Sequence, residues 1–287
     1  MHETGENVTV KHGDALALLD RLDPGSIDLV FADPPYNLSG TNHQTCRGGK
    51  MRACNKGEWD QIDDIHGFNR AWIEACMRVM KPGATIWISG TLHNHPVIGV
   101  VLKELGLWII NDVVWYKRNA PPLMQRNRLV PSTELIWVAA KSKKYYFDYD
   151  LARRINGGKQ MRNLWEINAQ RHITSHPTEK PESLLERIVL IGSKEGDLVV
   201  DPFLGSGTTG VVAKRLGRKF IGFEIDESYF AEAENRISGG MVIDDVTAYA
   251  EGVSTYPILG TQTSLKLADA VMEPARRARG ARKSAKN

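Results

Sequence analysis

The chain has 287 residues and a mass of 32.0 kDa, and its hydrophobic (42%) and charged (25%) fractions are ordinary for a globular protein. These values exclude a wholly disordered, collagen-like or disulfide-stapled chain and allow one large domain. The net charge is only +3, but basic tracts without acids occupy residues 47–56 and the last thirteen residues. Such tracts are typical either of contact with a polyanion or of solvated loops.

Short apolar runs alternate with amphipathic stretches, which predicts an α/β protein. We expect seven strands, at residues 8–11, 27–32, 84–89, 108–116, 134–139, 198–201 and 219–224. We expect helices at residues 15–22, 68–80, 96–105, 181–191, 208–216 and 229–237. The continuous apolar run 27–32 (IDLVFA) is typical of a buried parallel strand. The predicted fold is therefore a mostly parallel, seven-stranded Rossmann-like sheet with helices on both faces.

Two polar, irregular segments interrupt this pattern, at about residues 38–60 and 145–175. Long loops inside a compact domain are usually functional, so we expect both to be insertions that carry recognition. Beyond residue 240 the pattern weakens, and residues 241–287 are expected to be a basic, mobile extension. No apolar run approaches the roughly 20 residues that span a membrane, and the N-terminus does not resemble a secretory signal. The three cysteines suit a reducing compartment, so a cytoplasmic protein is expected.

The first motif, Asp33–Asn37 (DPPYN), follows directly after a predicted buried strand. Ligands bind at this end of parallel strands in open α/β sheets. The Asp33 carboxylate and the Pro34 carbonyl are hydrogen-bond acceptors, and Tyr36 offers a flat ring beside them. This cluster suits a planar substrate that carries an amino group, although a rigid turn after a strand is the simpler interpretation of DPP alone.

The second motif, Asp201–Thr209 (DPFLGSGTT), also joins a strand to a helix, and Glu224 ends the next strand. Its glycines permit a tight turn and close approach of a ligand to the backbone. Glu224 is placed to accept hydrogen bonds from ribose hydroxyls. As bare spacing, Gly205, Gly207 and Gly210 also fit GxGxxG, so a dinucleotide remains an alternative ligand.

Together these motifs resemble the amino-DNA methyltransferases that use S-adenosylmethionine. DPPYN precedes DPFLGSGTT and IGFEID, which is similar to the circularly permuted β-class order, and His176–Pro181 (HPTEKP) is a third match. The resemblance spans about residues 6–238 and implies a catalytic domain at residues 1–240. It implies transfer of a methyl group to adenine N6 in double-stranded DNA, by base flipping and without a covalent intermediate.

Carried over residue by residue, the resemblance implies an amine-holding and base-stacking pocket at Asp33, Pro34, Pro35 and Tyr36. It implies that S-adenosylmethionine is bound by Asp14, Asp33, Lys180, Asp201, Phe203, Gly205, Ser206, Gly207, Thr208 and Glu224. Within this set, Lys180 would meet the methionine carboxylate. At Ser132-Thr133-Glu134 the chain departs from the family, which often has His-Glu there, so the resemblance assigns this position no role.

Candidate DNA contacts are Asn37, Arg47, Lys50, Arg52, Lys56, Lys117, Arg118, Arg126 and Arg128. The basic members are equally compatible with solvated loops. A homodimer and a cognate restriction endonuclease, as in a restriction-modification system, are further partners that the family suggests. We expect a bacterial, archaeal or phage origin on the same ground.

Several alternatives differ in chemistry. The same pocket could hold the N4 amine of cytosine, although aspartate at position 33 favours adenine because the family more often has serine there for cytosine. C5-cytosine methylation requires a Pro-Cys nucleophile, which the chain lacks. An NAD-dependent oxidoreductase would explain GxGxxG and leave DPPYN unused. No metal is expected, because His43, Cys46, Cys54 and His66 fit no paired zinc-ligand spacing.

Overall fold

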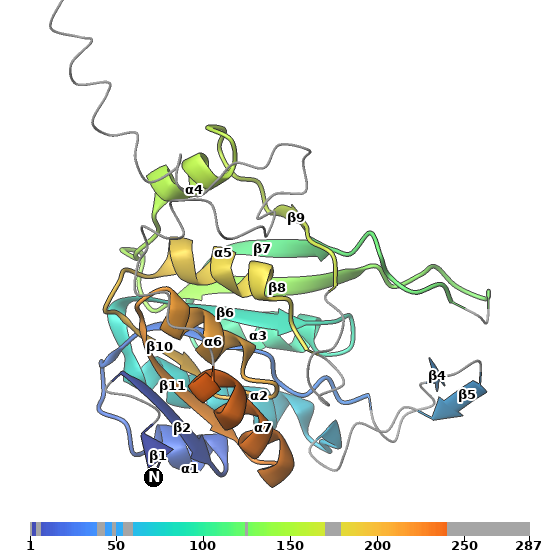
Figure 1. The fold of residues 1–287 in the computed structure, drawn as a ribbon, viewed down its shortest axis with the longest axis horizontal. Coiled ribbons are helices and arrows are strands. Elements are labelled where there is room, and N and C mark those ends of the chain that lie inside the picture. Colours follow the sequence, from blue (N-terminus) through green and yellow to red (C-terminus); the bar gives the residue numbers. More distant parts are fainter. Residues whose placement is uncertain are drawn as a thin grey trace, which may run out of the picture.

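In the computed structural model, the described residues are 2–3, 7–38, 44–47, 50–53, 60–123, 126–169 and 179–239. Within them, nine strands form the main sheet in the order β1-β2-β11-β10-β3-β6-β8-β7-β9 (Figure 1). Their bounds are β1 His2–Glu3, β2 Val8–His12, β3 Ile27–Ala32, β6 Met80–Gly90, β7 Trp108–Tyr116, β8 Thr133–Ala140, β9 Leu164–Glu166, β10 Leu198–Asp201 and β11 Lys219–Glu224. All seven predicted strands are present, and the mostly parallel sheet is confirmed; β1 and β9 are short additions at its two edges.

The strand directions divide the sheet into two parts. Strands β2, β11, β10, β3 and β6 are parallel, whereas β8 is antiparallel to both β6 and β7. Since β7 therefore runs in the same direction as β6, its carboxyl end lies at the same edge of the sheet. All the connections that leave this edge can contribute to one site.

Helices cover both faces of the sheet, as predicted. On one face lie α1 (Ala15–Leu19), α2 (Ile65–Val79) and α3 (His95–Glu104); on the other lie α4 (Tyr149–Ile155), α5 (Glu182–Gly192), α6 (Thr208–Arg215) and α7 (Glu227–Gly239). Each face has its own apolar core: Trp72 of α2 is fully buried in the first, and Leu184 of α5 in the second. None of the described helices is long and apolar enough to cross a membrane.

The crossover connections reverse direction between β10 and β3. From β10 the chain passes through α6 to β11 on one side, whereas from β3 it passes through α2 to β6 on the other side and the opposite face (Figure 1). A crevice forms outside the carboxyl ends of two parallel strands where such connections diverge. The two sequence motifs, which follow β3 and β10, therefore lie side by side at the crevice.

The prediction that residues 145–175 are irregular is wrong in two places. Asp148 caps α4 by accepting a hydrogen bond from the amide of Leu151 at 2.8 Å, and Ala152 and Ile155 bury one face of that helix. Strand β9 then pairs in parallel with β7 and buries Trp165. Both elements are short, so their few apolar positions gave no clear periodicity in the sequence.

Part of the other irregular segment forms a separate hairpin. Strands β4 (Gln44–Arg47) and β5 (Lys50–Ala53) pair antiparallel outside the main sheet (Figure 1). Three candidate DNA contacts, Arg47, Lys50 and Arg52, belong to these strands. Lys56, the first half of the HPTEKP motif (residues 176–178) and the expected extension 241–287 lie outside the described residues.

Candidate active site

One pocket lies at the carboxyl ends of four neighbouring parallel strands. Its walls come from the segments that follow β2, β3, β10 and β11, with further side chains from α2 and α7. The lining includes Gly13, Asp14, Asp33, Pro34, Pro35, Tyr36, Phe68, Trp72, Lys180, Asp201, Phe203, Gly205, Ser206, Thr208, Glu224 and Tyr229. The structure thus brings together both sequence motifs and most residues predicted to hold the amine or the cofactor.

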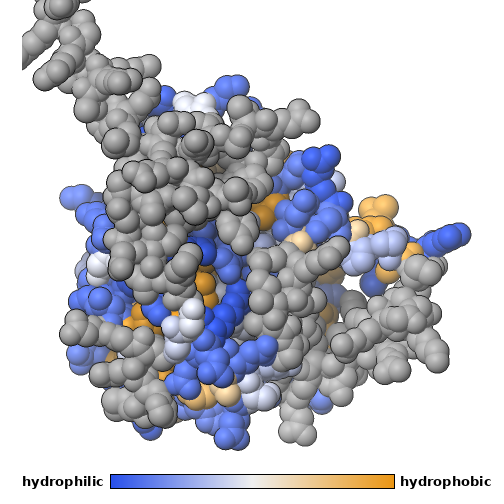
Figure 2. Space-filling view, viewed as in Figure 1, coloured by the Kyte–Doolittle hydropathy of each residue, from blue (hydrophilic) through white to orange (hydrophobic). Residues whose placement is uncertain are grey.

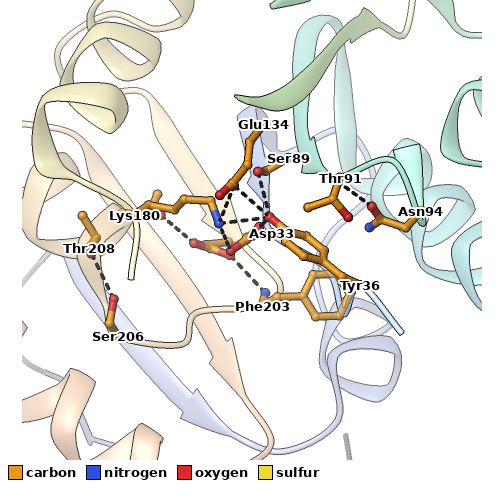
Figure 3. Close-up of polar contacts among 12 residues, drawn as sticks. Asp33, Tyr36, Ser89, Thr91, Asn94, Glu134, Lys180, Phe203, Ser206 and Thr208 are labelled. Carbon is orange, nitrogen blue, oxygen red and sulfur yellow. Dashed lines mark hydrogen bonds and ion pairs between the residues drawn. The ribbon is translucent and has the colours of Figure 1, made fainter. Parts of the chain in front are cut away.

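At the DPPYN end of the pocket, Lys180 lies between two carboxylates (Figure 3). Its Nζ atom is 2.5 Å from Asp33 Oδ2 and 3.4 Å from Glu134 Oε2. Tyr36 donates its hydroxyl hydrogen to Asp33 Oδ1 at 2.5 Å, and the same hydroxyl lies 3.2 Å from Ser89 Oγ. Both oxygens of Asp33 therefore have donors within the protein.

A second lysine completes this cluster, which we call the lysine–carboxylate cluster: Asp33, Glu134, Lys117 and Lys180. Lys117 donates to Glu134 Oε1 at 2.8 Å. Burial alone would raise the pKa of Glu134, but the two ammonium groups outweigh burial and lower it to about 2. Burial alone would likewise lower the pKa of Lys180, but the two carboxylates outweigh burial and raise it. Glu134 is therefore ionised and Lys180 protonated at neutral pH.

Lys180 is held in place through its neighbour Glu179. Arg236 of α7 forms an ion pair with Glu179 at 2.9 Å and donates to the Ser206 carbonyl at 3.0 Å and to Thr208 Oγ1 at 3.1 Å. One arginine thus ties the segment that carries Lys180 to the glycine-rich turn of the second motif. The sequence analysis missed Arg236, because no local pattern links a helix-surface arginine to two turns far away along the chain.

The glycine-rich turn is closed by Glu224. Its Oε2 atom accepts a hydrogen bond from the Gly205 amide at 2.7 Å, and its Oε1 atom accepts from the Asp226 amide at 2.9 Å. Gly205 and Gly207 have φ angles of 52° and 78°, which favour glycine. Gly207, predicted to line the cofactor, instead lies against Ala233 of α7, where a Cβ atom would come within 3.0 Å of the alanine Cβ.

An aromatic wall forms the side of the pocket opposite the sheet. Phe203 contacts the edge of Trp72 with ring centroids 5.3 Å apart, and its centroid is 6.1 Å from that of Phe68. Trp72 lies in the predicted helix 68–80 and is fully buried in the core of its face of the sheet. Its spacing from Phe68 marks one face of α2, but only the fold shows that this face ends at the pocket.

Two aspartates of the predicted cofactor set have different surroundings. Asp14 caps α1 by accepting from the Ala17 amide at 3.0 Å and stays at the pocket wall. Asp201 is buried and accepts from the Thr209 hydroxyl at 2.6 Å and the Phe203 amide at 3.0 Å. Burial raises the pKa of Asp201 to about 7, although these hydrogen bonds oppose the rise. Asp201 therefore stabilises the turn in addition to lining the pocket.

These surroundings suit S-adenosylmethionine by their chemistry. Carboxylates at Asp14 and Glu224 can accept hydrogen bonds from an adenosine, and the aromatic wall can contact its rings. Lys180 is a buried cation at the same pocket and can pair with an amino-acid carboxylate.

Asn37, a candidate DNA contact, forms hydrogen bonds that join the two ends of the 38–60 segment. Its side chain donates to the Ile62 carbonyl at 2.9 Å and accepts from the Ile62 amide at 3.1 Å. Its backbone amide donates to Asp60 at 2.8 Å, and its φ angle of 56° turns the chain sharply. The asparagine of DPPYN therefore joins the two ends of the segment, and contact with DNA stays a prediction.

Four more candidate contacts, Lys117, Arg118, Arg126 and Arg128, lie on the connection between β7 and β8, which projects from the sheet edge that carries the pocket (Figure 1). Lys117 is largely buried in the lysine–carboxylate cluster, whereas Arg118 is exposed and paired with Glu166 at 3.0 Å. Arg126 and Arg128 are exposed. Figure 2 shows a largely hydrophilic face with apolar side chains on this projection, where Leu129 is 91% exposed.

The raised pKa of Asp201 predicts a pH effect on stability. Between pH 3.8, the ordinary pKa of an aspartate, and about pH 7, the unfolded state releases this proton while the folded state keeps it. Rising pH therefore lowers the free energy of unfolding through Asp201. The stability that Asp201 contributes is lost completely above about pH 7. Asp201→Asn does not titrate; its side-chain oxygen can accept from the Phe203 amide, while its side-chain NH2 group can donate to the Thr209 hydroxyl. Urea unfolding between pH 5 and pH 8 should show wild type losing stability relative to Asp201→Asn. If the difference in free energy of unfolding between wild type and Asp201→Asn did not change with pH, the raised pKa of Asp201 would be contradicted.

Comparison with known proteins identifies the family. The N6/N4 methyltransferase profile, described as DNA methylase, matches residues 27–235. The chain is 42% identical to type II methyltransferase M2.LlaDCHI of Lactococcus lactis subsp. cremoris, over 82% of this chain and 91% of the relative. It is 43% identical to type II methyltransferase M2.DpnII of Streptococcus pneumoniae, over 79% of this chain and 88% of the relative.

Solved structures agree with this assignment. The PvuII DNA methyltransferase (cytosine-N4-specific) shares the fold with a TM-score of 0.65 at 22% identity, over 82% of this chain and 94% of the other. M1.HpyAVI in complex with SAM gives a TM-score of 0.62 at 26% identity, over 80% of this chain and 98% of the other. This chain belongs to the N6/N4 DNA methylase family and is a type II DNA methyltransferase.

Proposed function

We propose that this protein transfers a methyl group from S-adenosylmethionine to N6 of adenine in double-stranded DNA. The observation that carries the proposal is the position of Asp33 and Tyr36, which lie in the same pocket as the glycine-rich turn and Glu224. An amine acceptor and a nucleoside-binding turn thus meet at one place. Because the target amine is inside the helix in duplex DNA, the base has to be flipped out to reach them.

Asp33 and Pro34 would orient the target amine. Its nitrogen lone pair is delocalised into the purine ring, which makes it a poor nucleophile. Accepting its hydrogen bonds at Asp33 Oδ2 and at the Pro34 carbonyl directs the lone pair out of the ring plane, and fixed positioning supplies much of the remaining rate. Burial and the charges of Asp33 and Glu134 raise the pKa of Tyr36 well above its usual value, so its hydroxyl stays neutral and continues to hold Asp33.

The cofactor would lie between the glycine-rich turn and the aromatic wall. Glu224 is placed to accept hydrogen bonds from ribose hydroxyls, Asp14 lies on the adenine side, and Lys180 can pair with the methionine carboxylate. When bound, S-adenosylmethionine supplies the activated methyl group. The chain's own residues hold the amine and exclude water. The reaction does not require a covalent bond between the enzyme and the base.

Cytosine N4 is the alternative target, since its exocyclic amine offers the same donors. Asp33 favours adenine on the family pattern.

Exposed Arg126 and Arg128 are proposed to contact phosphates beside the flipped base, together with the basic residues of the 38–60 segment. The bacterial, type II relatives support a cytoplasmic enzyme of a restriction-modification system, with a cognate endonuclease and a homodimer as further partners.

The first test is mass spectrometry of nucleosides from mixed-sequence DNA treated with the protein and S-adenosylmethionine. We expect N6-methyladenine from wild type. Asp33→Ala should lower the rate by on the order of 10²–10³-fold, because the amine loses its charged acceptor. Asp23→Ala, which removes an exposed carboxylate far from the pocket, should match wild type. N4-methylcytosine would overturn the base assignment, and absence of any methylated base would contradict DNA methylation.

Cofactor binding gives a second test that needs no DNA. S-adenosylmethionine at a hundred times its Kd should raise the melting temperature by about 5–10 °C, whereas NAD should not. Glu224→Ala should reduce this shift, because the ribose loses its acceptor. Glu227→Ala, an exposed acid that begins α7, should keep it. Stabilisation by NAD instead would contradict the proposed cofactor.

A further inference from the structure

We propose that Glu134 is a positioning residue for methyl transfer: it offers Lys180 a second anion, so that Lys180 can leave Asp33 when the target amine arrives. The proposal rests on the function proposed above. It gives a role to Glu134, next to Thr133, where this chain departs from the family pattern.

The first step of the argument is a conflict at Asp33. Lys180 Nζ donates to Asp33 Oδ2 at 2.5 Å, and the Tyr36 hydroxyl donates to Asp33 Oδ1 at 2.5 Å. Lys180 lines the pocket and is only 6% exposed. The ammonium of Lys180 thus donates to the same carboxylate oxygen that the N–H groups of the target amine would use. Withdrawal of the lysine frees this oxygen for the base and removes a competing donor from the amine site.

The second step concerns where Lys180 can go. Glu134 Oε2 is 3.4 Å from Lys180 Nζ, whereas a charge-assisted N–H···O bond is about 2.7–2.9 Å long. A shift of roughly half an ångström therefore converts the loose contact with Glu134 into a hydrogen bond. Glu134 cannot follow Lys180 into the pocket, because Lys117 holds its other oxygen at 2.8 Å. Glu134 does not line the pocket, so it acts through the pocket residues that it contacts, Lys180 and the Tyr36 hydroxyl at 3.3 Å, and not on the substrate. The proposal assigns its effect to Lys180.

The third step is the balance of charge. The lysine–carboxylate cluster holds two ammonium groups and two carboxylates; Lys180 is buried and the Glu134 side chain is 16% exposed. A buried ammonium that leaves its only anion pays a large desolvation cost. With Glu134 present, Lys180 stays paired when it leaves Asp33 and can also reach the cofactor carboxylate. Without Glu134, Asp33 is the only carboxylate of the cluster left to it, and the lysine blocks the amine site.

The test is a double-mutant cycle with Glu134→Gln, Lys180→Met and both together. Two quantities are measured: the Kd for S-adenosylmethionine without DNA, by calorimetry, and the single-turnover rate of DNA methylation at saturating cofactor and DNA. Glu134→Gln should weaken cofactor binding and slow turnover by on the order of 10²-fold, because Lys180 stays on Asp33. In the Lys180→Met background, Glu134→Gln should change neither quantity, because no lysine remains to be displaced.

The outcomes distinguish this proposal from its alternatives. If the effects of the two single variants multiply in the double variant, Glu134 does not act through Lys180 and the proposal fails. Glu134→Asp keeps the charge, so it should lie closer to wild type than Glu134→Gln; it also serves if Glu134→Gln does not fold, as judged by its melting curve. Glu104→Gln, which removes an exposed acid paired with Arg70, should match wild type. Absence of DNA methylation by wild type would instead contradict the proposed function.

Discussion

The buried ion pair between Asp33 and Lys180 connects the two halves of this site. Asp33 directly follows β3, and Lys180 lies 147 residues later, before α5, which covers one face of the sheet. Pairing two buried charges is costly unless every remaining donor and acceptor is satisfied. Tyr36 satisfies the second oxygen of Asp33, and Glu134 with Lys117 balances the charge. The DPPYN turn, the start of β8 and the segment before α5 are thereby fixed relative to one another.

Two aspartates at the carboxyl ends of adjacent parallel strands have different surroundings. Asp33 lies at the pocket and accepts hydrogen bonds from Lys180 and Tyr36. Asp201 is buried beside an amide and a hydroxyl, and its pKa is raised to about 7. Divergent environments for like groups commonly separate their roles in an active site. In the proposed function Asp33 receives the target amine, while Asp201 maintains the glycine-rich turn through its contacts with Phe203 and Thr209.

The sequence predicted the sheet and both motifs because these depend on local signals. Apolar runs mark the strands, and Asp33 and Asp201 each follow such a run directly. The sequence could not show that Glu134 and Lys117 meet Lys180, or that Arg236 reaches Glu179, because these contacts join distant elements through the tertiary fold. It also missed α4 and β9, because each has too few buried residues to form a recognisable pattern, and it did not show that Trp72 lines the pocket.

The most direct test of this account is a crystal structure of the protein with its target DNA and an unreactive analogue of S-adenosylmethionine. The account predicts that the flipped adenine amine lies within hydrogen-bond distance of Asp33 and of the Pro34 carbonyl. It predicts that Lys180 Nζ has left Asp33 and approached Glu134 Oε2. A flipped base seated elsewhere, or Lys180 still at 2.5 Å from Asp33 in the loaded complex, would contradict it.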